Sequence, residues 1–418
     1  MKVVHLAYDY GTAGVGGAAI AATRLHCALL SHGVESHYIC CHQAEPGTNV
    51  MVLPLGRLAR AVRYLVTRAI WCLGYITGQH RIFTPNLVPL WGLERCLRRL
   101  APDVIHVHWI MMDMISFGQL AHWRVPTVMT LHDLFMVNVL EPYPAADRRY
   151  LEGVNRGNAG LVEHWLFARK RRAMSACRPM IVGPSEWICR LSSQSVIGRG
   201  LEAVMLPNLV DPAFFAAPAP QGVNPRMRVV FGAVGGRTNP VKGWDDLAAA
   251  LKRLPAAVRE RMEVSVFGES AADYELAHVP VRFAGVVKSA AALRQIYAAG
   301  DVFALPSRED NAPQTKFEAL LSGLMVVAFD RTGCAEGIEN GVNGFVAADG
   351  DLDGYARALE AAFRLWERGE LGSRRPTIAA AARARYGEDA LVDGYLKLYV
   401  SASGRSSRFK DQRRRCRK

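Results

Sequence analysis

The fold class of this chain is decided by one stretch, Asp301-Val-Phe-Ala-Leu-Pro-Ser-Arg-Glu-Asp-Asn-Ala-Pro-Gln-Thr-Lys-Phe-Glu318-Ala-Leu-Leu-Ser-Gly323. It begins as an apolar strand that ends at Pro306-Ser307, continues as a short acidic loop, and then becomes a helix that turns Glu318 inward. A strand that feeds such a loop and helix places loop amides and a helix N-terminus at its carboxyl end, where they attract anions.

Two carboxylates flank this predicted anion site. Asp310 lies in the loop, and Glu318 lies eight positions later, one or two turns into the helix. Phosphate-binding amides between two hydroxyl-binding carboxylates suit a nucleotide-sugar. The pattern therefore predicts a nucleotide-sugar site at this strand end.

Short apolar runs alternate with helical patterns along the whole chain, which is typical of parallel α/β domains. We expect six strands in each half and two Rossmann-like, doubly wound domains that face a cleft. A segment rich in proline, alanine and glycine at 208–226 marks the expected boundary. The expected strands span 3–8, 36–41, 104–109, 126–131, 180–183, 203–206, 228–234, 263–267, 281–284, 301–305, 325–329 and 344–347.

The stretch 301–323 resembles the signature of the retaining glycosyltransferases of family 4, which have the GT-B fold. The family's pattern is Glu, seven residues, then Glu; here Asp310 replaces the first Glu, follows Glu309, and is shorter by one methylene. The resemblance implies an N-terminal acceptor domain at 1–207 and a nucleotide-sugar donor domain at 208–384. It also implies that a helix at 385–403 crosses back to the N-terminal domain. We expect the basic tail 404–418 to be disordered.

The same resemblance assigns roles in the donor domain. Glu318 would hold the nucleotide ribose and Asp310 the hydroxyls of the donor sugar, and Glu309 and Asn311 lie beside them as further donor-binding residues. Neither carboxylate is an obvious nucleophile. We therefore expect front-face transfer, in which the leaving phosphate assists deprotonation of the acceptor.

A second loop, Gly235-Gly236-Arg237-Thr-Asn-Pro-Val-Lys242-Gly243, follows the first strand of the second domain. Arginine binds phosphate oxygens through two prongs and lysine acts as a point charge. A solvated loop is the plainer interpretation of such a pair. The family's diphosphate-binding residues occupy the same place, so the resemblance implies that Arg237 and Lys242 hold the diphosphate.

The N-terminal domain offers two candidates at strand ends. A glycine-rich turn that includes Gly16 and Gly17 leads from the first strand into a helix of small residues. His132 follows the strand 126–131. Each has a structural alternative, a tight turn or a packed imidazole. The resemblance places the glycine loop across from the donor phosphates and His132 near the transferred sugar as a catalytic residue.

His106 and His108 face one side of a strand, so a metal site is conceivable there. No third ligand with suitable spacing accompanies them, and we expect no metal and no cofactor. The nucleotide-sugar is a substrate.

The net charge of +13 is concentrated in two segments. Residues 404–418 hold eight basic residues and one acid, and 46–93 hold five arginines and no acid. Nucleic-acid binding is therefore not expected. A helix at 57–73 would place Leu58, Val62, Leu65, Val66, Ala69, Cys72 and Leu73 on one face and Arg57, Arg60, Arg63 and Arg68 on the other.

The apolar face of this helix has two interpretations. It packs on the domain and leaves the arginines in water, or it lies in an anionic membrane interface together with the tail 404–418. The second agrees with the lipid-linked acceptors that are common in the family.

No export signal or long apolar run opens the chain, so we expect a cytoplasmic protein, peripheral to the inner face of the membrane. The nine cysteines form no paired motif, and we expect their thiols to be reduced. The expected function is transfer of a sugar to an acceptor hydroxyl of a carbohydrate or lipid-linked acceptor in bacterial surface polysaccharide or lipopolysaccharide synthesis. Two alternatives stay open: another GT-B-like enzyme such as a nucleotide-sugar epimerase, and a catalytically weak membrane-associated assembly partner.

Overall fold

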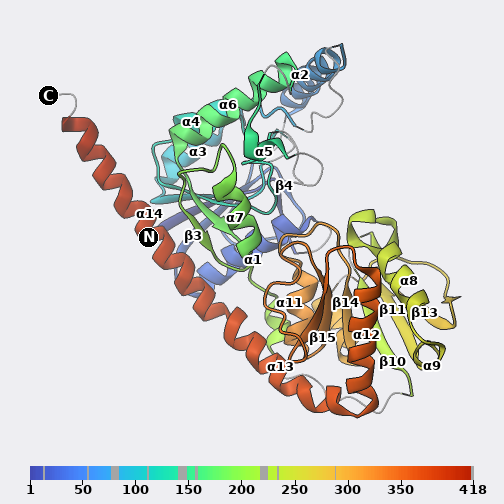
Figure 1. The fold of residues 1–418 in the computed structure, drawn as a ribbon. Helices are drawn as coiled ribbons and strands as arrows, with labels where there is room; N and C mark the ends of the chain where they lie inside the picture. The colour runs from blue at the N-terminus through green and yellow to red at the C-terminus, as the bar shows by residue number, and fades with distance from the viewer. Residues whose placement is uncertain are drawn as a thin grey trace. The chain divides into compact units, whose positions relative to one another are not determined.

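The structure is a computed structural model. It describes residues 1–12, 15–53, 56–76, 84–110, 113–139, 148–155, 159–216, 225–232, 235–287 and 289–415, and side chains within these ranges except at position 74 and from 405 onward. The chain divides into two compact units (Figure 1). The N-terminal unit comprises Met1–Asn208 with Asp389–Lys418, and the C-terminal unit comprises Leu209–Glu388.

The N-terminal unit contains a parallel sheet of seven strands in the order β5-β3-β1-β6-β7-β8-β9. Its strands are β1 (Lys2–Leu6), β3 (Glu35–Cys40), β5 (Val50–Val52), β6 (Val104–Val107), β7 (Thr127–Thr130), β8 (Met180–Gly183) and β9 (Ala203–Met205). A separate pair joins β2 (Asp9–Tyr10) to β4 (His42–Gln43). The central strands are buried and mostly apolar because helices cover both faces, as parallel sheets require; His5 on β1 and His106 on β6 are buried exceptions.

The helices of this unit fill the crossovers between strands. They are α1 (Gly17–Ser31), α2 (Arg57–Ile76), α3 (Leu93–Leu100), α4 (Phe117–His122), α5 (Arg149–Glu152), α6 (Leu161–Cys177), α7 (Glu186–Gln194) and α14 (Glu388–Arg415). At the start of α4, Ser116 and Gln119 form a reciprocal capping box that satisfies backbone N–H groups of its first turn.

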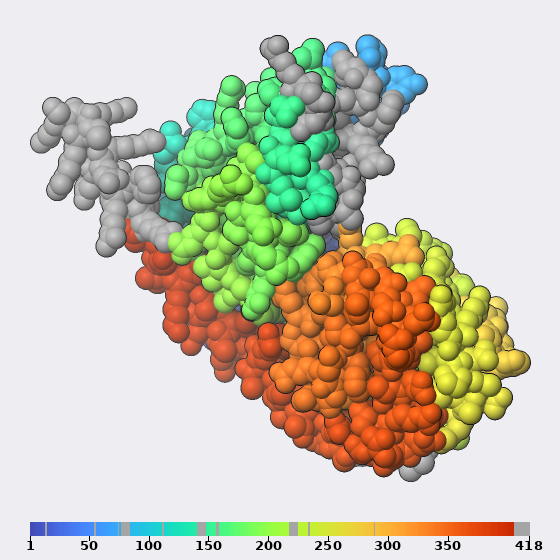
Figure 2. All heavy atoms as spheres, viewed as in Figure 1, coloured from blue at the N-terminus to red at the C-terminus, as the bar shows by residue number. Residues whose placement is uncertain are grey.

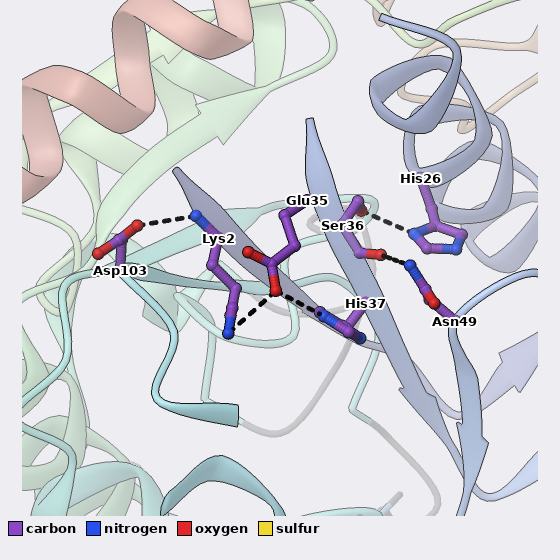
Figure 3. Close-up of polar contacts among 7 residues, drawn as sticks. All are labelled: Lys2, His26, Glu35, Ser36, His37, Asn49 and Asp103. Atoms are coloured by element: carbon purple, nitrogen blue, oxygen red, sulfur yellow. Dashed lines mark hydrogen bonds and ion pairs between the residues drawn. The ribbon is translucent and has the colours of Figure 1, made fainter. Parts of the chain in front are cut away.

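Polar side chains secure the β1–β3 register at its amino end, as Figure 3 shows. Lys2 places its Nζ 2.9 Å from the Glu35 carboxylate, and the Lys2 backbone N–H donates to Asp103. Buried Ser36 is held by His26 at 2.7 Å, and its carbonyl accepts from Asn49. The Lys2–Glu35 ion pair is consistent with the register, in which Lys2 lies opposite Glu35.

The C-terminal unit repeats the architecture with the order β12-β13-β11-β10-β14-β15-β16, in which only the edge strand β12 is antiparallel. Its strands are β10 (Met227–Gly232), β11 (Met262–Phe267), β12 (Tyr274–Leu276), β13 (Val279–Gly285), β14 (Val302–Leu305), β15 (Met325–Asp330) and β16 (Gly344–Ala348). Its α-helices are α8 (Trp244–Arg253), α9 (Ala256–Arg259), α10 (Ala290–Ala299), α11 (Gln314–Leu321), α12 (Leu352–Glu367) and α13 (Glu370–Tyr386). Three short 3-10 turns are η1 (Pro212–Phe215), η2 (Gly236–Thr238) and η3 (Pro240–Lys242).

Both sheets have the Rossmann strand order, so the expected doubly wound α/β fold is confirmed for each unit. The order reverses between β1 and β6 in one unit and between β10 and β14 in the other. Ligands of such sheets bind at the carboxyl ends of the strands that flank the reversal. This rule directs attention to the loops after β1, β6, β10 and β14.

All twelve expected strands are present, with ends that differ by up to two residues where the structure describes them. Position 234, the last of the expected strand 228–234, lies outside the described residues. The expectation missed β5 and β12, which are three-residue edge strands, and the two-residue pair β2 and β4; all four are too short for a clear apolar pattern.

The last helix extends beyond its expected end, and the disorder of 404–418 stays a prediction. Helix α14 runs to Arg415, past the end expected at 403, because no proline interrupts the segment and its charged and serine residues tolerate a helix. No described helix is apolar over a stretch long enough to cross a bilayer.

Helix α14 is joined to the first sheet by a buried polar contact. Tyr399 Oη lies 2.8 Å from Nδ1 of His106 on β6, and both residues are fully buried. The Tyr395 ring lies beside the same histidine, 5.8 Å between centroids.

Replacing Tyr399 with Phe should lower the free energy of unfolding by about 1–3 kcal/mol, because the buried His106 nitrogen loses its partner. Urea denaturation monitored by circular dichroism measures the change. Tyr64→Phe is the control, since Tyr64 is 61% exposed, and it should change stability by less than about 0.5 kcal/mol. Equal effects of the two variants would contradict the anchoring role.

Candidate functional site

In the C-terminal unit, the loops after β10 and β14 lie against one another. Gly243 has φ +73°, and a Cβ there would lie 2.1 Å from the Pro306 carbonyl oxygen, so only glycine permits this approach. The Arg308 N–H donates to the Val241 carbonyl at 2.8 Å. The backbone thus brings the two switch-point loops into direct contact.

This contact brings together two residues that the sequence singled out 68 positions apart. Lys242 Nζ lies 2.5 Å from Asp310 Oδ2, and the two side chains are 25% and 17% exposed. The Asp310 backbone carbonyl is 3.9 Å from the Cys334 sulfur of the loop after β15. A half-buried cation therefore lies at the carboxyl end of the sheet, beside a carboxylate and within reach of solvent.

Arg237 is paired with Glu269, a residue that the sequence analysis did not select. Arg237 Nη2 lies 2.9 Å from Glu269 Oε1, and the Arg237 backbone N–H donates to Oε2 at 2.9 Å. The hydrogen bond to Glu269 raises the pKa of Arg237 above its usual value, and the Phe283 ring lies 4.8 Å from the guanidinium. Glu269 follows β11 directly, so its place at a strand end was the signal that could have identified it.

Glu318 is almost entirely buried on α11, with 4% exposure, as the helical pattern predicted. Tyr297 on α10 donates its hydroxyl proton to Glu318 Oε2 at 3.4 Å. In the loop before α11, Asn311 is buried and Glu309 is half-buried. The two carboxylates therefore have different surroundings. Asp310 contacts the ammonium group of Lys242, and Glu318 lies next to the buried hydroxyl of Tyr297.

Lys316 is a second buried residue that the sequence analysis missed. Its Nζ donates to the carbonyls of Gly333 at 2.6 Å and Glu336 at 3.0 Å, and burial lowers its pKa to about 8. These bonds secure the loop after β15 next to Asp310. The available signal was a lysine on the same helix face as Ala319 and Leu320.

In the N-terminal unit, Gly16 is the N-cap of α1 and Gly17 its first residue. Neither has a positive φ, and a Cβ at either would meet no other atom within 4 Å. Protein packing therefore does not require glycine at these two positions. The missing side chains leave the amides at the start of α1 accessible, and α1 has no acidic residue in its first turn.

His132 lies after β7, half-buried, and belongs to a group of histidines. Its Nε2 is 3.3 Å from His108 Nδ1, and His108 Nε2 is 3.0 Å from His5 Nδ1 on β1. His106 is bonded instead to Thr130 and Tyr399, at 2.8 Å each. Burial lowers the pKa of His132 to about 4 and of His106 to about 3, and it holds those of His5 and His108 well below their usual value.

The expectation that His106 and His108 lack a third ligand was wrong. His5 pairs with His106 across β1 and β6, and nitrogen atoms of His5, His106 and His108 lie within 4.8 Å of one another. The sequence hid this neighbour because it is 101 positions away. Both nitrogens of His106 and both of His108 already have hydrogen-bond partners, so the donor set fits a hydrogen-bonded cluster better than a metal centre.

The loop after His132 is held by buried groups. Asp133 accepts from the Phe135 N–H at 2.8 Å and from Trp109 Nε1 at 3.3 Å, and burial raises its pKa to about 6. Lys170 on α6 donates to the carbonyls of Phe135, Asn138 and Val139. Burial lowers the pKa of Lys170 to about 7. These contacts fix the backbone that carries His132.

The two units match two sequence families. The family described as Glycosyltransferase Family 4 matches residues 15–214, and that described as Glycosyl transferases group 1 matches residues 228–364. With two Rossmann-like units and polar loops at the switch points, the chain has the GT-B fold and is a glycosyltransferase of this type. It belongs to glycosyltransferase family 4, as the signature at 301–323 predicted.

One full-length relative is the 2-deoxystreptamine N-acetyl-D-glucosaminyltransferase of Streptomyces fradiae, with 27% identity covering 94% of this chain and 92% of that protein. Sucrose-phosphate synthase from Thermosynechococcus elongatus has a similar structure, with a TM-score of 0.65, 14% identity, and coverage of 96% of this chain and 99% of that one. WaaG, a glycosyltransferase involved in lipopolysaccharide biosynthesis, aligns with a TM-score of 0.57 and 16% identity over 92% of this chain and 100% of its own. The two structural likenesses support the fold.

The buried histidines predict an acid-sensitive N-terminal unit. Their folded-state pKa values lie below the unfolded value of about 6.5, so the unfolded chain binds more protons and stability falls as pH drops from about 7 toward 4. Each histidine contributes a slope of up to about 1.4 kcal/mol per pH unit. Asp133, whose pKa is raised to about 6, opposes this trend between about pH 6 and 4 but is a single group.

Urea denaturation between pH 4.5 and 8 measures this dependence. His106→Gln removes one of the groups and should flatten the pH dependence, whereas His42→Gln should leave it unchanged because the side chain of His42 is 62% exposed. A stability that stays constant from pH 7 to 5 would contradict the neutral buried state.

Proposed function

We propose that this glycosyltransferase moves a sugar from a nucleotide-sugar to an acceptor hydroxyl with retention of anomeric configuration. The observation that carries the proposal is the Lys242–Asp310 pair at the switch point of the C-terminal unit. In this pair a lysine that could bind phosphate lies next to a carboxylate that could bind hydroxyls, on two loops that touch through Gly243. A diphosphate joined to a sugar offers an anion for the lysine and hydroxyl donors for the carboxylate.

Lys242 and Arg237 would hold the diphosphate. Both are half-buried and follow β10, and each is oriented by a carboxylate, Asp310 or Glu269. Two fixed cations stabilise the charge that develops on a departing nucleotide, so the proposed transfer needs no metal ion. Glu318 would bind the nucleotide ribose, and Asp310, with Glu309 and Asn311 beside it, the hydroxyls of the donor sugar.

The N-terminal unit would supply the Gly16–Gly17 loop and His132. The accessible amides at the start of α1 suit an anionic oxygen, and His132 suits a sugar hydroxyl. No side chain is proposed as a covalent nucleophile. Retention then follows from front-face attack, with the leaving phosphate taking the acceptor proton.

Nucleotide binding tests the donor site. The wild type should show a thermal shift with UDP, GDP, ADP or CMP, selective for one of the four bases. Lys242→Ala and Arg237→Ala should each weaken that shift at least tenfold in apparent affinity, because each loses a charge-assisted contact worth about 1.5–3 kcal/mol.

Arg282→Ala is the matched control, since this arginine is 60% exposed and paired with Asp273. A wild type that shifts with none of the four nucleotides would sink the donor-site assignment and favour the assembly-partner alternative. Turnover of a nucleotide-sugar without an acceptor, giving an epimer, would favour the epimerase alternative.

We further propose that the acceptor is lipid-linked or part of a surface polysaccharide or lipopolysaccharide, and that the cytoplasmic enzyme works at an anionic membrane surface. Support comes from α2, part of which lies at the surface in Figure 2. The structural similarity to WaaG agrees with this setting. The basic tail 404–418 is also proposed to bind the membrane surface. Its side chains from 405 onward lie outside those that the structure describes.

The two interpretations of α2 can now be compared. Its buried face is formed by Ala59 and Arg63, with Thr67 and Ile70 half-buried, and Arg63 donates to the Pro89 and Met114 carbonyls. The prediction that Arg63 shares a face in water with the other arginines was therefore wrong. The hydrogen-bond partners of this guanidinium are backbone carbonyls of residues distant in the chain, which the sequence alone does not reveal.

The aliphatic face expected to pack on the domain is instead largely in solvent. Leu58 is 71% exposed, Leu65 64% and Ile76 78%. Arg57, Arg60 and Arg68 are also exposed, as are the aromatic rings of Tyr64, Trp71 and Tyr75. An aliphatic stripe beside aromatic and cationic side chains is the composition of a helix that lies in a membrane interface.

Vesicle sedimentation tests this surface. The wild type should bind vesicles of phosphatidylglycerol more tightly than vesicles of phosphatidylcholine, because each arginine near anionic lipid contributes about 1 kcal/mol. Leu58→Ser with Leu65→Ser should weaken binding at least tenfold, since a buried leucine contributes about 1.5–3 kcal/mol.

Leu161→Ser provides the control, because Leu161 is 75% exposed but lies at the start of α6. If the control and the α2 double variant bind equally well, the membrane surface is not α2.

A further inference from the structure

The carboxyl ends of β1 and β6, where strand order reverses in the N-terminal unit, carry a pair of aromatic side chains. The Tyr8 backbone N–H donates to the Trp109 carbonyl at 3.0 Å, so the two segments stay side by side beyond the strands. The two rings are half-buried and perpendicular, with centroids 6.4 Å apart and 89° between their planes. This pair lies where the Rossmann strand order places a ligand, and the roles proposed above do not use it.

Contacts with neighbouring loops hold the two residues in place. Trp109 Nε1 donates to Asp133 Oδ2 at 3.3 Å, and Oδ1 of the same carboxylate accepts from the Phe135 N–H at 2.8 Å. The Tyr8 carbonyl accepts from the Cys41 N–H at 2.9 Å. The loops after β3 and β7 therefore secure the aromatic pair, and a ligand would meet rings that are already positioned.

Helix α2 supplies positive charge beside this pair. Burial raises the pKa of Tyr8, and Arg63 and Arg60 oppose that shift, so both guanidinium groups lie within electrostatic range of the phenol. Arg63 is buried, whereas Arg60 is exposed. The acid nearby, Asp9, has His42 Nδ1 3.1 Å from its carboxylate. The aromatic pair therefore adjoins a cation that an anionic ligand can reach.

A sugar ring joined to a phosphate suits these features. The two faces of a pyranose consist of C–H groups that pack on flat aromatic rings, and its hydroxyls hydrogen-bond to polar groups such as the Tyr8 phenol. Two perpendicular rings form a corner, in which a pyranose can lie on one ring and abut the other. A phosphate attached to that sugar would bind the Arg60 guanidinium.

We propose that Tyr8 and Trp109 form the binding site for the acceptor sugar, and that this sugar is carried on a phosphate bound by Arg60. The inference rests on the proposed function, since it gives the acceptor a place and a chemical class. Leu58 and Leu65, on the same helix as Arg60, belong to the surface proposed to lie in a membrane. Arg60 thus joins the sugar site to the membrane surface, and the phosphate links the sugar to a lipid.

Fluorine NMR of the full-length protein labelled with fluorotryptophan tests this site. The Trp109 signal is assigned by its loss in Trp109→Phe. The probes are the anomeric phosphates of glucose, galactose, mannose and N-acetylglucosamine. At least one of these sugar phosphates should shift the Trp109 signal saturably at millimolar concentration. The corresponding methyl glycoside, which lacks the phosphate, should need at least a tenfold higher concentration.

Inorganic phosphate alone should leave the Trp109 signal unchanged, because it has no ring to pack on the aromatic pair. An equal shift with inorganic phosphate would overturn the sugar site, since it would reveal an anion site only. The proposal also fails if none of the four sugar phosphates moves the Trp109 signal.

Calorimetry with the sugar phosphate that binds most tightly tests the contact residues, in a Lys242→Ala background that removes the proposed donor site. Trp109→Leu and Tyr8→Leu should each weaken binding at least tenfold, because each loses an aromatic face. Trp109→Phe keeps a flat ring and should retain most of the affinity. Arg60→Gln should weaken binding of the sugar phosphate but not of the methyl glycoside.

Trp165→Leu is the matched control, since Trp165 is 44% exposed on α6 of the same unit and should not affect binding. Equal affinities of Trp109→Leu and Trp165→Leu would contradict the aromatic site. If Trp109→Leu does not fold, Arg60→Gln still decides, because its exposed position tolerates the change and an unaltered affinity would refute the phosphate contact.

A matched pair of esters identifies the carrier. The methyl ester and the farnesyl ester of the same sugar phosphate have equal charge and differ only in their apolar group. The farnesyl ester should bind at least tenfold more tightly, and Leu58→Ser with Leu65→Ser should remove that difference. Equal affinities of the two esters for the wild type would overturn the lipid-linked acceptor and favour a soluble sugar phosphate.

Separate outcomes distinguish this inference from the proposed donor site. Lys242→Ala should lose the thermal shift with the nucleotide and keep the Trp109 response, and Trp109→Leu should keep the thermal shift and lose sugar phosphate binding. A wild type in which Trp109 responds while no nucleotide binds would refute the donor site alone. A wild type that binds a nucleotide while Trp109 responds to no sugar phosphate would refute the acceptor site alone.

Discussion

Both units depend on one constraint, the burial of a parallel sheet on its two faces. Helices cover both faces, so the central strands are mostly apolar and their buried polar groups must be hydrogen-bonded, while solvated polar groups emerge where the strands end. At the reversal of strand order the helices diverge and the loops form the ligand-facing edge. The Lys242–Asp310 pair and the loop that carries His132 both lie at carboxyl ends of strands for this reason.

Two of the buried lysines serve this edge. Lys316 and Lys170 each donate to carbonyls of a loop that follows a strand, Lys316 in the C-terminal unit and Lys170 in the N-terminal one. Burial lowers the pKa of each, which shows that the protein accepts an electrostatic cost to hold these loops in place. The buried histidines follow the same logic, with imidazoles kept neutral by burial.

For helix α2, the sequence pattern predicted the helix correctly but not which of its faces contacts the domain. The amphipathic spacing at 57–73 predicted a helix, and the helix is present. The periodicity could not show which face meets the domain, because a wheel orders residues around a helix without locating its neighbours. The contact of Arg63 with the Pro89 and Met114 carbonyls, and of Thr67 with Asp113, sets that rotation and leaves Leu58 and Leu65 exposed.

The sequence by itself determined the strands, the doubly wound class and the family, because apolar runs and the spacing of Asp310 and Glu318 are local properties of the chain. Positions after strands and the family resemblance also nominated Lys242, Arg237 and His132, whose roles stay predictions. Only the tertiary structure decided their partners: Glu269 for Arg237, Asp310 for Lys242, and His108 with His5 for His132. The members of each pair follow different strands. Strand order and register bring together residues up to about a hundred positions apart, and both are set by packing of the whole sheet.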